Sequence, residues 1–208
     1  RVVARLEALQ PDLVFNTAEG TRGRMREAFY PALFDRLGMP FTGSDAYACA
    51  LTLDKQVAKM VVASRGVKTP AWRFCNDVTD LDVSGLRFPL MVKPNFEGSS
   101  MGITQDSVVE TQSKLVSRVV ELLSRYPAGV LVEEYIEGQD IVVPFLEKAS
   151  PKTEGVLEPA AYVYDKSDDD SRRHQIYDFD LKTSGSDKVS VQMPAPLSSE
   201  DRATVMKL

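Results

Sequence analysis

The sequence has few of the residues that build redox and metal sites. It contains two cysteines and one histidine in 208 residues. Cys49 and Cys75 do not have the short spacing of metal ligands, so we interpret them as reduced thiols. His174 lies among aspartates and arginines, and we interpret it as a solvated loop residue rather than a ligand.

Charge and hydropathy exclude two further classes of partner. The net charge is −5 and there is no large basic block, so we expect no nucleic-acid partner. No apolar run is long enough to span a bilayer, and the sequence after Arg1 is not a signal peptide. We therefore expect a cytoplasmic protein without a membrane partner.

Both ends of the chain indicate a piece of a longer protein. The sequence starts at Arg1 rather than at a methionine, and it stops at Leu208 inside an expected helix. We therefore expect further residues of the natural protein on both sides.

Apolar spacing and capping residues predict alternating helices and short strands in the first part of the chain. The predicted helices have caps at Gly38, at Ser44 or Asp45, and at Asp54. We expect four helices: one over 2–9, one that ends at Leu37 with Pro31 in its first turn, one that ends at Leu53, and one over 55–65. The last should have an apolar face of Val57, Met60 and Val61. We also expect strands over 13–15 and 40–42, and a polar loop over 16–26.

The remaining residues predict two sheets. The first contains an edge segment over 67–74, strands at 88–93 and 129–134, and a return strand from Gly102. A helix with an apolar face should pack on it, with Leu115, Val116, Val119, Val120 and Leu123. We expect the second sheet at 139–146, 155–164, 175–181 and 189–193, with a charged loop over 165–173 and a last helix capped by Ser198.

The stretch from Leu90 to Ile103 contains the most chemical information. An apolar run ends at Lys93, and a loop rich in glycine and serine follows. Backbone N–H groups and a nearby cation suit a polyphosphate, and here the lysine precedes the loop instead of following it as in a Walker A motif. The alternative is a buried strand followed by an ordinary Gly/Ser turn.

Other charged residues fit the same ligand. Lys55 follows a helix cap, where the dipole disfavours a cation and so favours an anionic partner. Glu133 and Glu134 end a strand, and Asp140 follows shortly after. Cations for phosphates, a strand edge for adenine and a carboxylate for ribose are what a nucleotide needs. Lys55, Glu133 and Glu134 could instead be solvated.

In this order, the motifs resemble the ATP-grasp superfamily and, within it, the D-alanine–D-alanine ligase family. Each motif is weak alone, but together they cover nearly the whole chain. The matching residues are 41–44, 53–55, 88–94, 97–103, 130–138 and 177–182, with 194–195 as a shorter match.

The resemblance implies an α/β (α+β) chain with the ATP-grasp fold. A nucleotide would lie between two antiparallel-rich sheets, after the remainder of a Rossmann-like N-terminal domain. The implied division is 1–43 for the rest of an N-terminal α/β substrate domain, 44–133 for the central ATP-grasp subdomain, and 134–208 for part of the C-terminal ATP-grasp subdomain.

The resemblance also implies roles for individual residues. Lys55 and Lys93 would contact the phosphates of ATP. Gly98, Ser99 and Ser100 would lie on the loop that closes over phosphate and substrate. Glu133 would accept from the adenine amino group, beside the backbone of Glu134, Tyr135 and Ile136. Asp140 would bind the ribose, where the family has glutamate, and Lys182 would reach the γ-phosphate. Lys182 could instead be an ordinary loop lysine.

The implied reaction is an ATP-dependent ligation of a carboxylate to an amine, giving a dipeptide-type amide. ATP phosphorylates the carboxylate, and the amine attacks the acyl phosphate. The implied cofactors are ATP and Mg²⁺, with the metal ligands and an oxyanion-stabilising arginine expected beyond Leu208. We also predict a homodimer. As given, the chain should bind nucleotide weakly and fail to complete ligation.

Three residues depart from the family pattern. Glu19 stands where D-alanine ligases have a histidine, and it could hold a substrate ammonium or be a loop acid. Arg24 stands where an acid is common, and it could bind a substrate carboxylate or be solvated. Thr183 replaces a tyrosine. The alternatives are therefore a ligase of another pathway with a substrate other than D-alanine, and a non-catalytic ATP-grasp-like binding module.

Overall fold

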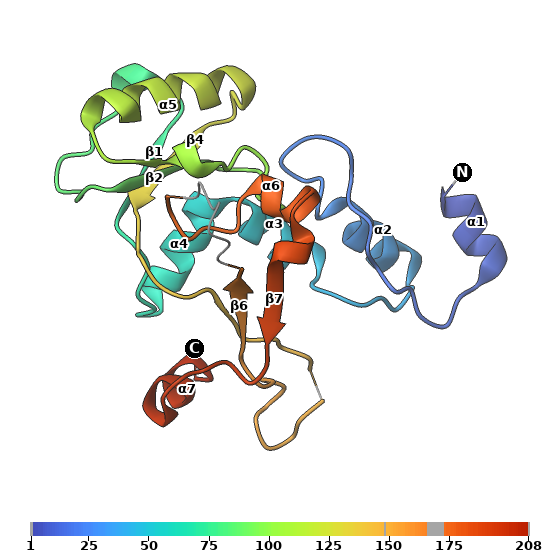
Figure 1. Ribbon diagram of the computed structural model, residues 1–208. Coiled ribbons are helices and arrows are strands. Elements are labelled where there is room, and N and C mark those ends of the chain that lie inside the picture. The colour runs from blue at the N-terminus through green and yellow to red at the C-terminus, as the bar shows by residue number, and fades with distance from the viewer. Residues whose placement is uncertain (1, 148, 166–172, 208) are drawn as a thin grey trace. The chain divides into compact units, whose positions relative to one another are not determined.

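The structure is a computed structural model that describes residues 2–147, 149–165 and 173–207 (Figure 1). The chain divides into two compact units. The first contains the residues up to Thr69 together with Asn95–Gly98, and the second contains Pro70–Pro94 and the residues from Ser99 onward. No described helix has the length and apolar character needed to cross a bilayer.

The first unit contains the predicted helices. Its helices are α1 (Val2–Leu9), α2 (Phe29–Leu37), α3 (Ala46–Leu53) and α4 (Lys55–Ser64). Asp45 and Asp54 are the N-caps of α3 and α4, each accepting a hydrogen bond from a backbone N–H of the first turn. Gly38 ends α2 in the left-handed conformation, with φ of 66°.

Two predictions for this unit are wrong. The strands expected at 13–15 and 40–42 are reduced to one parallel bridge between Val14 and Phe41, because Pro40 has no N–H to extend the ladder. The buried residue of α4 is Lys59, whose Nζ donates to Thr69 Oγ1 at 2.6 Å. The expected apolar face is exposed: Val57, Met60 and Val61.

The first sheet of the second unit has the antiparallel order β1-β4-β2-β3. Its strands are β1 (Trp72–Cys75), β2 (Leu90–Pro94), β3 (Val108–Val109) and β4 (Val130–Glu134). Helix α5 (Gln112–Arg125) lies across this sheet in Figure 1 and buries Leu115, Val119 and Leu122 completely. This contact is the core of the unit.

The return to β2 differs from the prediction. Ser99, Ser100 and Gly102 have positive φ, and the chain curls through a 3-10 helix (Gln105–Ser107) before the short β3. In α5, Val116 and Val120 are exposed and Leu122 is buried instead. A further 3-10 helix follows β1, at Val78–Asp80.

The second sheet has the antiparallel order β5-β6-β7, with β5 (Ile141–Val142), β6 (Ala160–Tyr164) and β7 (Val189–Gln192). The strand predicted at 175–181 is wrong. Asp178 accepts from Leu181 N and starts helix α6 (Phe179–Thr183). A 3-10 helix (Ser186–Lys188) leads into β7.

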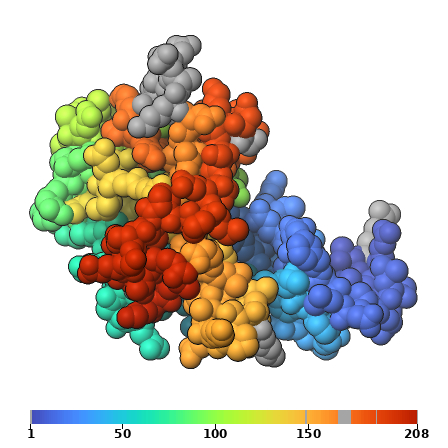
Figure 2. Space-filling view, turned by 60° about the horizontal axis from the view of Figure 1, so that its bottom comes forward, coloured from blue at the N-terminus to red at the C-terminus, as the bar shows by residue number. Residues whose placement is uncertain are grey.

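The chain after the second sheet forms α7 (Ser199–Val205), which Ser198 caps as predicted. Residues near its end line a groove together with the 141–156 segment, and Figure 2 shows the two segments side by side. Most of the charged loop predicted over 165–173 lies outside the described residues. The fold class is confirmed: a mixed α/β chain with two antiparallel sheets.

Candidate functional site

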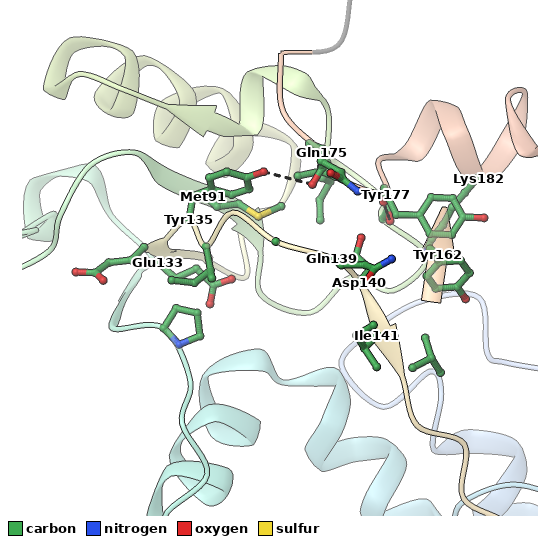
Figure 3. Close-up of a pocket in the computed structure, with 18 residues that line it drawn as sticks. Met91, Glu133, Tyr135, Gln139, Asp140, Ile141, Tyr162, Gln175, Tyr177 and Lys182 are labelled. Atoms are coloured by element: carbon green, nitrogen blue, oxygen red, sulfur yellow. Dashed lines mark hydrogen bonds between the residues drawn. The ribbon is translucent and has the colours of Figure 1, made fainter. Parts of the chain in front are cut away.

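A cavity of 540 Å³ lies in the second unit, lined by both sheets and by α6. Met91 and Glu133 come from the first sheet, Tyr162 from the second, and Lys182 from α6. In Figure 3, Glu133 and Lys182 lie at opposite sides of the cavity, with Asp140 between them. The volume is in the range of small-molecule and cofactor sites, about 300–1,000 Å³.

The two glutamates of β4 have different partners because neighbouring side chains in a strand point to opposite faces. Glu133 accepts a hydrogen bond from Lys93 Nζ, and its side chain is 9% exposed. Glu134 is held by Arg87, whose Nη2 lies 2.8 Å from Oε2 and whose Nε lies 3.2 Å from Oε1. The Arg87 hydrogen bonds hold the pKa of Glu134 below its ordinary value. Lys93 therefore contacts Glu133, which lines the cavity, and is not itself a lining residue.

The backbone after β4 is partly used by the sheet. Glu134 N donates to Ala71 O and Tyr135 N donates to Pro89 O, each at 3.0 Å. Ile136 lines the cavity and is exposed, and no partner for its N–H occurs among the described residues. Of the predicted adenine-binding segment, Ile136 has the backbone donor open to a ligand.

Tyrosines surround Asp140 and Lys182. The hydroxyl of Tyr164 donates to Asp140 Oδ2. The Tyr177 ring lies 5.0 Å from that of Tyr162 and 6.0 Å from that of Tyr164. Lys182 Nζ lies 5.0 Å from the centre of the Tyr177 ring, within cation–π distance. Sequence reasoning missed these tyrosines, although residues 162 and 164 alternate in a predicted strand and so share one face.

The Gly/Ser loop reaches the cavity through one of its serines. Ser100 lines the cavity and its Oγ donates to Tyr177 O at 2.6 Å. Ser99 is exposed and is not among the lining residues. A backbone hydrogen bond from Phe179 N to Ile103 O, at 3.1 Å, also joins the loop to α6. The loop and the helix bearing Lys182 are therefore bonded directly.

The end of the loop is held by a buried arginine that the sequence did not indicate. Arg118 Nη2 donates to Gly102 O at 2.8 Å and to Ser107 Oγ at 2.9 Å. A Cβ at Gly102 would lie 2.8 Å from both Pro94 and Tyr126, and φ there is 76°. Position 102 therefore requires glycine.

The other predicted site residues lie in the first unit. Lys55 Nζ donates to the carbonyls of Asn95 and Glu97, at the start of the Gly/Ser loop. A Cβ at Gly98 would lie 2.8 Å from Glu27 Oε1, so the chain passes close to that carboxylate. The guanidinium of Arg24 lies 4.3 Å from the centre of the Phe96 ring.

Glu19 belongs to a cluster around a second buried arginine that sequence reasoning missed. The Arg26 side chain is 8% exposed, and its Nη1 donates to Phe96 O at 2.7 Å. Its guanidinium lies 3.4 Å from the Glu19 carboxylate and 3.3 Å from that of Glu97. Glu19 is itself 51% exposed, so its carboxylate remains open to solvent on one side.

The interpretation of His174 as a solvated residue is wrong. The residue is half-buried, and its ring packs edge-on against Tyr135 at 5.4 Å. Its Nε2 is buried and has no hydrogen-bond partner among the described residues. The charged residues that precede it in the sequence indicated a solvated loop and gave no sign of this packing.

Within the described ranges, no group of three or more histidine, cysteine, aspartate or glutamate residues has an arrangement that could hold a metal ion. Both cysteines are free thiols, with Cys75 buried, and burial raises the pKa of the Cys75 thiol.

Comparison with known proteins gives a consistent result. The model of the family described as "D-ala D-ala ligase C-terminus" matches residues 56–208. A D-alanine–D-alanine ligase of Aquifex aeolicus is 34% identical over 163 residues, which are 77% of this chain and 54% of that protein. A Sinorhizobium fredii protein named "Uncharacterized protein y4sG" is 37% identical over 134 residues, 64% of this chain and 39% of that protein.

Among solved structures, the D-alanine–D-alanine ligase of Bacillus anthracis complexed with ATP superposes with a TM-score of 0.69 at 21% identity. The match covers 99% of this chain and 60% of that one. It shows that the two share a fold. The chain spans about half the length of the curated relatives it matches.

Proposed function

The chain belongs to the D-alanine–D-alanine ligase family, and from that premise we propose that it forms part of an ATP-dependent ligase. The enzyme would join a carboxylate to an amine through an acyl phosphate. The observation that carries the proposal is that Glu133 and Asp140 line one cavity of cofactor size together with Lys182, which lies 42 residues after Asp140 in the sequence. A structural neighbour with the same fold is named as a complex with ATP.

Residues that line the cavity could bind the adenine, the ribose and the phosphates of ATP. Glu133 would accept from the adenine amino group, and the N–H of Ile136 would donate to the ring beside it. Asp140 would accept from the ribose hydroxyls. Ser100 and Lys182 would face the phosphates, because both belong to the side of the cavity that bears α6. Glu134 is committed to Arg87 and would contribute its backbone only.

The chemistry follows from the properties of a carboxylate. Its negative charge repels a nucleophile, and oxide is a poor leaving group. Transfer of the γ-phosphoryl group from ATP to a carboxylate oxygen releases ADP and creates a better acyl donor, from which the attacking amine then displaces phosphate. Lys182 would bind the γ-phosphate and offset the charge that develops during transfer. The family resemblance also assigns Lys55 and Lys93 to the phosphates, and Lys93, which here bonds to Glu133, would have to leave that carboxylate to reach one. The Gly/Ser loop, with Ser99 at its tip, would exclude water from the acyl phosphate.

Further parts of the proposal concern the complete protein. We propose magnesium dependence, a cytoplasmic location and a homodimer, as well as the division at residues 43/44 and 133/134. Magnesium would spread the charge of the phosphates during transfer. Nucleic acid and membrane are not among the proposed partners.

The residues that bear on the identity of the substrate are not those that indicate the type of reaction. Glu19, in place of the histidine of D-alanine ligases, keeps a half-exposed carboxylate that could hold a substrate ammonium, while Arg26 fixes its other side. D-alanine also carries an ammonium, so it is the departure from the family's histidine that favours an amino-acid or peptide substrate other than D-alanine.

The test is phosphate release by the full-length protein with ATP, Mg²⁺ and a panel of D- and L-amino acids. We expect release that depends on one class of amino acid. Lys182→Met should lower kcat strongly, and Lys114→Met, an exposed lysine of α5, should leave it unchanged. Turnover with D-alanine alone would contradict the substrate argument. ATP binding with no turnover for any amino acid would instead favour a binding module.

A further inference from the structure

The carboxylate of Asp140 is held on one side only. Tyr164 donates its phenol proton to Oδ2, and no hydrogen bond to Oδ1 occurs among the described residues. Asp140 is exposed in the cavity wall, where an unsupported carboxylate would sample several rotamers. The Tyr164 hydroxyl therefore limits the orientation in which Oδ1 faces the cavity.

The pairing of β5 with β6 explains why these side chains meet. Tyr162 N donates to Asp140 O at 3.0 Å, which extends the ladder by one residue beyond β5 and sets Asp140 opposite Tyr162. Tyr164 is two residues further along β6, so it lies on the same face and diagonal to Asp140. A diagonal neighbour is within reach of an aromatic side chain.

The surroundings fix the phenol. The Tyr164 ring packs at 6.0 Å against Tyr177, which in turn packs at 5.0 Å against Tyr162. Burial and the hydrogen bond to Asp140 raise the pKa of Tyr164 far above its ordinary value. The phenol is therefore protonated at neutral pH, where it can donate to Asp140.

We propose that Tyr164 is a positioning residue that gives the site its preference for ATP over nucleotides that lack one of the two ribose hydroxyls. It occupies Oδ2 of Asp140 and leaves Oδ1 oriented to accept from a ribose hydroxyl. An aspartate is one methylene shorter than the glutamate of the family pattern, so its reach and direction depend more on such a support. This inference rests on the proposed use of ATP.

The experiment measures binding of ATP, 2′-deoxy-ATP and 3′-deoxy-ATP to the full-length protein by titration calorimetry, which requires no amino-acid substrate. The wild type should bind ATP at least about tenfold more tightly than one of the deoxy nucleotides, as expected for a hydrogen bond to a charged group. Tyr164→Phe keeps the ring and removes the hydroxyl, so it should reduce this ratio severalfold while thermal melting shows an intact fold. Tyr47→Phe, on an exposed tyrosine of α3, is the matched control and should preserve the ratio.

A double-mutant cycle separates positioning from general damage. Asp140→Ala removes the acceptor and should abolish the ribose preference, and adding Tyr164→Phe should then change the ratio no further. A wild type that binds no nucleotide would overturn the proposed function and this inference together. ATP binding without any ribose preference, or a preference that Tyr164→Phe leaves intact, would overturn the inference alone.

Discussion

Replacing Arg118 by methionine tests whether the end of the Gly/Ser loop is anchored as described. Methionine keeps the apolar stem of the side chain but removes the donors to Gly102 O and to Ser107 Oγ. The pair with Glu121 adds little, because that carboxylate is half-exposed. The perturbation therefore acts mainly on Ser107 Oγ, which is buried, and on Gly102 O, which is part-buried.

The magnitude follows from what each acceptor loses. A buried polar group left without its partner costs about 1–3 kcal/mol. Ser107 Oγ loses less than this because it still accepts from Thr104 N at 3.0 Å. Arg118 Nε is buried and has no hydrogen-bond partner among the described residues. Because methionine removes this unsatisfied group, the loss of stability is partly offset. The expected loss is about 2–3 kcal/mol, a large share of the 5–15 kcal/mol typical of a folded protein.

The single tryptophan makes the assay specific. Trp72 lies in β1, so its fluorescence during urea denaturation reports on the second unit. Arg125→Met is the matched control on the same helix, because Arg125 is 60% exposed and lies 3.9 Å from Glu121. It should change stability by less than about 0.5 kcal/mol. If Arg118→Met is no more destabilising than Arg125→Met, the anchoring role is refuted.

Two further changes have clear expected outcomes. Gly129→Ala should lower the urea midpoint well beyond Gly85→Ala, because its Cβ would lie 2.4 Å from the ring of Phe74, whereas Gly85, also with positive φ, has open space; equal midpoints would contradict this. Arg87→Met should destabilise the protein at pH 7, and the gap to wild type should close as pH falls below the ordinary Glu134 pKa of 4.5. The pKa of Glu134 is lower in the folded protein than its ordinary value, so the stability that its pair with Arg87 contributes is present above pH 4.5 and is lost as pH falls through the pKa of the folded state. A difference in stability that does not change with pH would show that the pair is not its cause.

The parts of the fold that local sequence determines were predicted well. Asp45, Asp54 and Ser198 cap their helices as expected, because an N-cap needs only a side chain and the next turn of backbone. The same logic was missed at Asp178, where alternating apolar residues favoured a strand and the cap started α6 instead.

The candidate site was predictable only where a motif carried it. Glu133, Asp140 and Lys182 were found from their motifs, and all of them line the cavity. Arg118 and Tyr164 were not, because each acts through a partner distant in sequence, and a single sequence gives no sign of such pairs.

Whether adenine lies against β4 is tested most directly by photoaffinity labelling of the full-length protein with 8-azido-ATP, followed by peptide mapping. The expected result is a label that ATP displaces, on peptides containing Met91 or residues 133–136. A label that ATP does not displace, or one confined to the separate groove near α7, would contradict a nucleotide site in the cavity.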